Sequence, residues 1–60
     1  MVRALEKLGF ARTGGKGCHV KLRKGSHVVV VPMHSELAPG TMRSVLEQAG
    51  IDAQTLRDAL

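Results

Sequence analysis

Alternation of polar and apolar residues is the clearest pattern in this chain. From His19 to Arg23 every second residue is apolar, and from Ser26 to Met33 a mainly β-branched run follows. Between them, Lys24-Gly25 has the composition of a two-residue hairpin turn. The pattern predicts two antiparallel strands. Pro32 is expected on an edge or at a strand end, because proline donates no ladder hydrogen bond.

The register of this hairpin decides which side chains share a face. A turn at Lys24-Gly25 predicts three cross-strand pairs: Arg23–Ser26, Lys21–Val28 and His19–Val30. Because successive side chains of a strand point to opposite faces, one face of the hairpin is aliphatic and must pack on a core. It comprises Val20, Leu22, Val29 and Val31. The other face carries a row of His19, Lys21 and Arg23, beside the apolar Val28 and Val30.

The segment before the hairpin predicts a helix and a short strand. Val2, Leu5 and Leu8 recur at helical spacing, and Gly9 suits a helix C-terminus, so a helix is expected over residues 2–8. Phe10 to Thr13 predicts a brief strand that ends at Gly14-Gly15-Lys16-Gly17.

After the hairpin the period changes to that of a helix. An apolar stripe begins after Pro39 and runs to Ala49, and Gly50 closes the helix. Asp52 is a predicted N-cap, flanked by an Ile51–Leu56 hydrophobic staple, for a last short helix ending at Leu60.

The order of elements is therefore α-β-β-β-α with a short extra C-terminal helix. It predicts an α+β fold, a three-stranded antiparallel sheet with helices on one face, forming a single domain over residues 1–60. The longest apolar run, Val28 to Met33, is too short to span a membrane. A lone cysteine, Cys18, and no signal peptide favour a cytoplasmic location. The three dispersed histidines have no zinc-ligand spacing, so neither a metal nor a cofactor is expected.

Charge then points to the kind of partner. The formal net charge is +4, and seven of the nine Lys and Arg residues lie in the first 24 positions. An excess of positive charge favours an acidic partner, first of all nucleic acid. Phe10 is the only aromatic ring of the Phe, Tyr and Trp class, which argues against base stacking as the binding mode. Contact with phosphates and with RNA shape is the better expectation.

His19 is the strongest candidate for chemistry. Histidine exchanges a proton near neutral pH, and Lys21 and Arg23 beside it would attract phosphate. RNA carries its own nucleophile, the 2′-hydroxyl, so strand scission needs a base, an acid and charge stabilisation but no metal. The alternative is a surface histidine on a basic strand that has no functional role.

Other residues are weaker candidates. The glycines before and after Lys16, including Gly17, would let backbone N–H groups approach a phosphate, or they form only a flexible turn. Thr41 and Arg43 at a helix start would seat a phosphate, or they simply face solvent. His34 either assists His19 or hydrogen-bonds the Ser35-Glu36 loop, and the structural role is favoured.

Two further residues near the hairpin are expected to be structural. Cys18 precedes His19, so it is expected to point to the aliphatic face as a small buried filler. His27 is expected on the core side of the hairpin near its turn, half buried.

Three segments together resemble a known family. They are Gly17-Cys18-His19, then Val29-Val30-Val31-Pro32-Met33-His34, and then the run from Leu37 to Ile51 that contains Gly40-Thr41-Met42-Arg43 and Gln48-Ala49-Gly50. This combination is similar to the HicA family of mRNA interferase toxins, from Leu5 through Ile51. The resemblance implies a double-stranded-RNA-binding-domain-like (dsRBD-like) fold, ribosome-independent mRNA cleavage and a HicB antitoxin that covers the active site.

The family's catalytic histidine, in a Gly-Ser-His motif, falls on His19. The chain departs from the family at Cys18, where serine is usual, and at Leu22, which stands in place of the aromatic residue that the family commonly has soon after the histidine. Serine could help to hold phosphate, so the departure bears on the level of activity but leaves the proposed base in place.

The combined expectation is a metal-free endoribonuclease toxin in which His19 activates the 2′-hydroxyl or protonates the leaving oxygen. RNA-binding roles are expected for Lys16, Gly17, Lys21, Arg23, Thr41 and Arg43. Its expected partners are mRNA and a HicB-like antitoxin, which could cover the exposed Val28 and Val30. One alternative is a non-catalytic dsRBD-like RNA-binding module. Another is a protein that acts mainly as half of a toxin–antitoxin assembly repressing its own operon.

Overall fold

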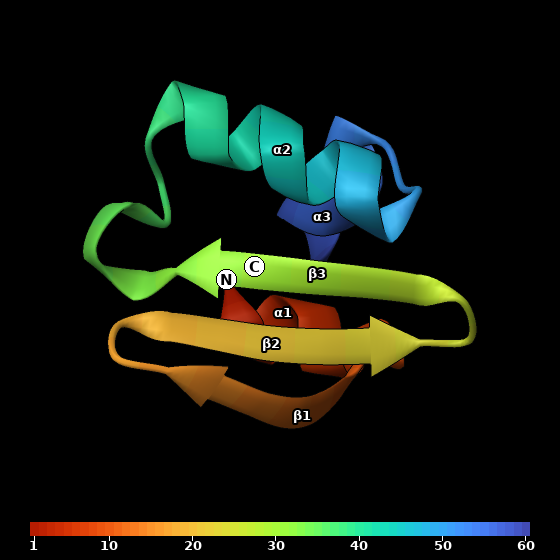
Figure 1. Cartoon of the computed structure of the whole chain (residues 1–60). Helices are drawn as coiled ribbons and strands as arrows, with labels where there is room; N and C mark the ends of the chain where they lie inside the picture. The colour runs from red at the N-terminus through yellow and green to blue at the C-terminus, as the bar shows by residue number, and fades with distance from the viewer.

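A computed structural model describes all residues, 1–60, and contains three strands and three α-helices (Figure 1). The elements follow the expected order, with one short 3-10 helix (η1) after the last strand. Their bounds are α1 Val2–Lys7, β1 Ala11–Lys16, β2 His19–Lys24, β3 His27–Pro32, η1 Met33–Ser35, α2 Pro39–Ala49 and α3 Ala53–Ala59. The strands form one antiparallel sheet in the order β1-β2-β3. The predicted α-β-β-β-α arrangement with a short added helix is confirmed.

The turn between β2 and β3 lies one residue later than expected. Its two loop residues are Gly25 and Ser26, and the pairs are Arg23–Val28, Lys21–Val30 and His19–Pro32. A turn at Lys24-Gly25 would demand a positive φ at Lys24 if it were of type I′. In the observed turn only Gly25, the first loop residue, has a positive φ (61°), which is the glycine position of type II′ turns. The predicted pairing was therefore wrong, although each residue keeps its predicted face.

β1 is longer than expected. Gly14, Gly15 and Lys16 belong to the strand instead of ending it, and they pair with Lys21, Val20 and His19 respectively. The register shifts between Arg12 and Gly14, so Thr13 is an extra residue on the β1 side of the ladder. A bulge of this kind increases the local twist and lets a glycine-rich segment continue a strand.

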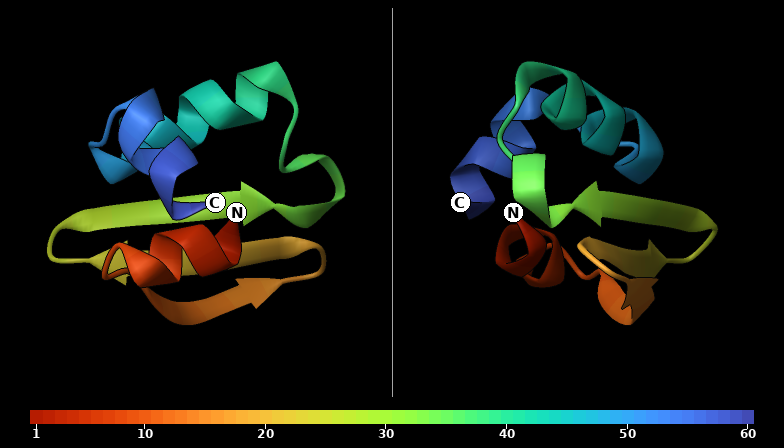
Figure 2. Two further views of the ribbon diagram at one scale, coloured as in Figure 1. Left: turned by 180° about the vertical axis from the view of Figure 1, so that it is seen from behind. Right: turned by 60° about the vertical axis from the view of Figure 1, so that its left-hand side comes forward.

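The two faces of the sheet differ as the alternation predicted. Val20, Leu22, Val29 and Val31 are buried, and they form one core with apolar residues of all three α-helices, including Leu5, Val45 and Leu56. Figure 1 looks onto the opposite face, with α1 behind the sheet, and no helix covers that side. Seen from behind, α1 and α3 lie over the sheet while α2 runs along β3 (Figure 2). The sheet therefore has one covered face and one open face.

α2 is joined to the free edge of β3 by a single glutamine. The Val30 backbone N–H donates to Gln48 Oε1 (2.9 Å), and Gln48 Nε2 donates to the Ser44 hydroxyl oxygen (2.9 Å) and carbonyl oxygen (3.2 Å). The His27 ring donates through Nδ1 to the Gln48 carbonyl oxygen (3.1 Å). A strand edge exposes unpaired backbone groups that attract other strands, and here helix side chains occupy it.

The ends of the helices also follow the sequence. Gly50 takes the left-handed conformation that closes α2. The Thr55 backbone N–H donates to Asp52 Oδ1 (2.7 Å) as the predicted N-cap of α3. Hydrogen bonding from Thr55, by its side chain first and its backbone second, lowers the pKa of Asp52. α3 ends at Ala59, with Leu60 as its C-cap residue.

The edge contact gives the first prediction. Gln48→Ala removes the acceptor of the Val30 N–H, so we expect it to lower the free energy of unfolding by about 1–2 kcal/mol, measured by urea denaturation. Glu47→Ala is the matched control, because Glu47 is an exposed neighbour with no hydrogen bond, and it should change stability by less than about 0.5 kcal/mol. Equal losses in both variants would contradict a specific role for Gln48.

Candidate nucleic-acid interface and histidine site

A row of polar side chains occupies the open face of the sheet. His19, Lys21 and Arg23 alternate along β2 with the buried Val20 and Leu22, so all three lie on the side that the helices leave uncovered. The predicted row is confirmed. Their β3 neighbours on this face, Val28 and Val30, are 39% and 38% exposed, as expected for apolar residues without cover.

Positive charge on the sheet has no negative partner within the chain. Residues 7–35 include six Lys and Arg residues and no Asp or Glu. The chain has one ion pair, between the Met1 amino group and Glu36 (3.3 Å), away from the sheet cations. The charge of the sheet therefore stays available to an anionic ligand.

The cations of β2 are not equivalent. Lys24 Nζ donates to the Leu8 carbonyl oxygen at the end of α1 (2.7 Å) and lies 5.8 Å from the centroid of the Phe10 ring. Lys24 thus helps to hold α1 on the sheet. Arg23 Nε donates to the Gly25 carbonyl oxygen (2.9 Å), which directs the guanidinium along the turn. Lys21 has no side-chain hydrogen bond and is free to meet a phosphate.

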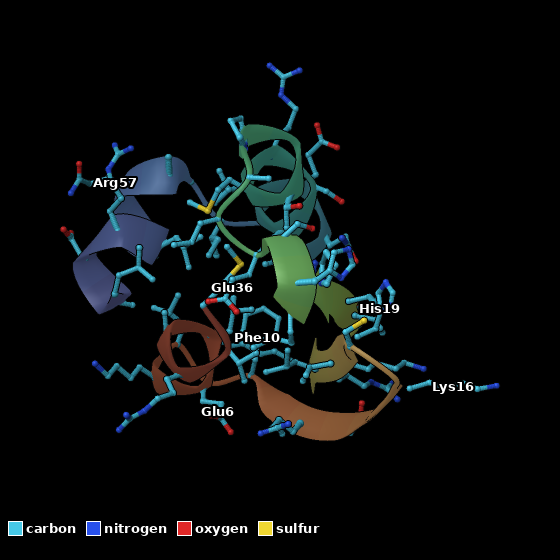
Figure 3. All side chains as sticks on the ribbon, turned by 90° about the vertical axis from the view of Figure 1, so that its left-hand side faces the viewer. Glu6, Phe10, Lys16, His19, Glu36 and Arg57 are labelled. Atoms are coloured by element: carbon cyan, nitrogen blue, oxygen red, sulfur yellow. The ribbon has the colours of Figure 1, made fainter.

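His19 is the first residue of β2 and pairs with Lys16 across the β1–β2 hairpin. Its ring and the Lys16 side chain project at the same end of the sheet, away from α1 (Figure 3). Gly17 and Cys18 form the two-residue turn between the strands, with Gly17 at φ 63°. The structure therefore brings three of the predicted site residues, Lys16, Gly17 and His19, into one hairpin end.

A shallow hollow of about 400 Å³ lies along this hairpin. Its lining comprises Arg12, Gly14, Gly15, Gly17, His19 and Val20. Three glycines leave the backbone without side-chain cover, and Arg12 adds a cation. The sequence offered Gly15 only as part of the glycine-rich segment and did not indicate Arg12 as a site residue, because the pairing that places both along the hairpin depends on the bulge at Thr13.

Gly15 is required by a close approach of the two strands. A Cβ atom at this position would overlap the His19 carbonyl oxygen and lie 3.1 Å from the Val20 Cα. The backbone of β2 beside His19 therefore packs directly on the bare Gly15 backbone. The absence of a side chain at position 15 therefore allows the observed backbone position of His19.

His34 lies beside His19. The two ring centroids are 6.0 Å apart and the ring planes meet at 76°. A hydrogen bond from the Met33 backbone N–H to the Cys18 carbonyl oxygen (2.6 Å) joins the segment of one histidine to that of the other. The favoured hydrogen bond from His34 to the Ser35-Glu36 loop was wrong, because Glu36 binds the Met1 amino group and the His34 ring has no hydrogen-bond partner in the protein.

The structure also tests the predicted burial of Cys18 and His27. Cys18 is exposed, so its predicted burial was wrong. It is the second loop residue of a turn, the place that Ser26 takes in the other hairpin, and loop side chains do not follow the alternation of the strand. His27 shares the side of Val29 as predicted, but it is exposed rather than half buried and binds Gln48 away from the site.

Thr41 and Arg43 lie in the first turns of α2. In Figure 1 this helix begins at the end of the molecule where β2 begins, the end that holds His19. No hydrogen bond links either side chain to the sheet. The two residues thus lie at the same end as the histidines, without a hydrogen bond to the sheet.

No three His, Cys, Asp or Glu residues are grouped so that they could hold a metal ion. None of the helices has the length and apolar character to cross a membrane.

Comparison with known proteins identifies the family. The family model described as the HicA toxin of bacterial toxin–antitoxin matches residues 1–51. The chain belongs to the HicA toxin family. No curated protein and no solved structure matches it.

The match to HicA covers every element that shapes the site. It runs from α1 through the sheet and α2, and it ends before α3 begins at Ala53. The earlier resemblance to this family is confirmed. HicA proteins are toxins of bacterial toxin–antitoxin systems, so this chain is a toxin whose counterpart is an antitoxin.

Gly15 of this HicA toxin provides the second prediction. Gly14 and Gly15 both have φ values that cost other residues about 1–3 kcal/mol (155° and 150°), but a Cβ on Gly14 would meet open space. Gly15→Ala should therefore destabilise the protein more than Gly14→Ala does, and it should shift the NMR resonances of the His19 ring. Equal unfolding midpoints for the two variants would contradict the close strand approach.

Proposed function

We propose that this HicA toxin is an endoribonuclease that cleaves mRNA independently of the ribosome and without a metal. His19 is the catalytic residue, and it either takes the proton of the 2′-hydroxyl or gives one to the leaving oxygen. The observation that carries the proposal is the position of His19 on the uncovered face, in a row of cations that have no carboxylate partner. Family membership supports the same conclusion.

The RNA strand itself supplies the nucleophile. When the 2′-oxygen attacks the adjacent phosphorus, negative charge increases on the phosphate oxygens, and nearby cations stabilise that charge. Lys16 across from His19 and Lys21 one position further along the face can supply it. Arg23, Thr41 and Arg43 are proposed to contact the RNA backbone on either side, and Gly17 lets the strand approach the turn.

The open face also suggests how the toxin is restrained. Val28 and Val30 expose apolar surface next to the cations, and an antitoxin that covered both would block access to His19. We propose a HicB-like protein for this role. Because the proposed substrate is mRNA, the proposed place of action is the cytoplasm.

Cleavage of a purified transcript in the presence of EDTA tests the proposal. Wild-type protein should cut, and His19→Ala should cut about 10²–10⁴-fold more slowly, which is the usual contribution of a proton-transfer residue. His27→Ala is the matched control: it also removes a histidine, but from outside the site, and it should cleave at the wild-type rate. Thermal unfolding of each variant confirms that it is folded.

A binding measurement separates the alternative, a non-catalytic RNA-binding module. Lys21→Gln should weaken RNA binding and reduce the slope of log affinity against log salt by about one, because one phosphate contact is lost. Salt-dependent binding of this kind without cleavage by wild-type protein would show a binding module. Equal cleavage by wild type and His19→Ala would remove the catalytic assignment.

A further inference from the structure

Two imidazole rings meet at one end of the open face. His19 begins β2 and His34 lies in η1, fifteen positions later along the chain, yet their ring centroids are 6.0 Å apart. Both residues are exposed, and neither ring has a hydrogen bond to the protein. The third histidine, His27, differs, since its ring is engaged by Gln48. The two neighbouring rings therefore keep their nitrogens free for a ligand.

The backbone fixes this neighbourhood. His19 pairs with Pro32 at the end of the β2–β3 ladder, and the Met33 N–H donates to the Cys18 carbonyl oxygen just beyond it (2.6 Å). These contacts hold the residue before each histidine in place and make η1 turn back over the β1–β2 hairpin. The rings are brought together by main-chain bonds, and no hydrogen bond between the rings is needed to keep them there.

We propose that His34 is a second catalytic residue and that the two histidines divide the two proton transfers of RNA cleavage. This inference rests on the proposed ribonuclease function and adds to it a named partner for His19. One neutral imidazole accepts the 2′-hydroxyl proton as the O2′–P bond forms. The other, protonated, gives its proton to O5′ as the P–O5′ bond breaks and its electron pair leaves with O5′. The products are a 2′,3′-cyclic phosphate and a 5′-hydroxyl end.

The geometry of the reaction favours two groups over one. In an in-line displacement the attacking and leaving oxygens lie on opposite sides of phosphorus, so one ring held by a strand cannot serve both at once. Carboxylates do not supply the second group, since residues 7–35 contain none and Glu36, two positions after His34, is paired with the Met1 amino group. Histidine is the side chain whose ordinary pKa suits proton exchange near neutral pH. His34 is the histidine within reach of the same phosphate.

The separation of the rings is consistent with a shared phosphodiester. Two rings whose centroids lie 6.0 Å apart can both reach one phosphodiester, one ring accepting from the 2′-hydroxyl and the other donating to O5′ at about 2.7–3.0 Å. Lys16, paired with His19, adds charge at the same end for the non-bridging oxygens. The site thus contains each group that the reaction requires: two proton carriers and a cation.

The test compares two short RNAs that contain a cleavage site mapped with wild-type protein. One is ordinary RNA, and in the other the bridging 5′-oxygen at that site is replaced by sulfur. Thiolate is a good leaving group that needs no proton, so loss of the general acid should matter little on the sulfur substrate. His34→Ala, His34→Gln and His19→Ala are measured on both, with His27→Ala as control and thermal unfolding as the test of folding.

On ordinary RNA, both His34 variants should be slower than wild type by about 10²–10⁴-fold. On the sulfur substrate, either the His34 variants or the His19 variant should recover by at least about tenfold, and the other should not. Recovery identifies the proton donor, and its absence identifies the base. The control should match wild type on both substrates.

Two outcomes would overturn the inference alone. In the first, wild type cleaves but the His34 variants cleave ordinary RNA within about threefold of it. In the second, the His19 and His34 variants both lose activity on ordinary RNA, and the sulfur substrate restores the activity of neither or restores both to the same extent. Failure of wild-type protein to cleave either RNA would instead overturn the proposed function, and the inference with it.

Discussion

The structure depends on one constraint: its helices bury only one face of a three-stranded sheet. Leu22, Val29 and Val31 are fully buried between the sheet and the helices, and the alternation along β2 and β3 turns the intervening side chains to water. On an open face a charged side chain needs no buried partner. The packing requirement of the core thus leaves a flat, accessible surface on which cations and a histidine can stand in a row.

The cations of the sheet serve either the fold or the proposed function. Lys24 lies on the covered side and contributes to the fold, because its amino group donates to the Leu8 carbonyl oxygen after α1 and lies near Phe10. Lys16 and Lys21 have no such contact, and the carboxylates lie elsewhere in the chain. A basic surface assembled in this way binds phosphate by charge and needs no aromatic platform, which fits a chain with a single phenylalanine.

Regular patterns made much of the fold predictable. The period of two fixed the faces of β2 and β3, and the period of 3.6 fixed α2 and its end at Gly50. The β2–β3 turn lies one residue later than predicted, because the prediction assigned glycine to the second loop position. The predicted faces of the side chains were nevertheless correct, since the pairing moved by an even number of residues. The bulge at Thr13 and the exposure of Cys18 could not be predicted, because both depend on how a glycine-rich strand meets β2.

The candidate site was predictable in part for the same reason. The row that contains His19 follows from local alternation. The approach of His34 depends on a hydrogen bond between backbone groups of Met33 and Cys18, and no local pattern encodes such a long-range contact. The role of Gln48 at the edge of β3 likewise depends on the packing of a helix against a strand distant in sequence.

The central claim is that the open face of the sheet, with His19 at one end, is the surface that meets RNA. NMR titration of labelled protein with a 2′-O-methyl oligoribonucleotide tests it most directly, because the blocked 2′-oxygen prevents cleavage during the measurement. We expect the largest shifts on His19, Lys21, Val30 and His34, while the resonances of α1 and α3 stay unchanged. Largest shifts in the groove between α1 and the end of α3, lined by Arg3, Lys7 and Leu60, would contradict it.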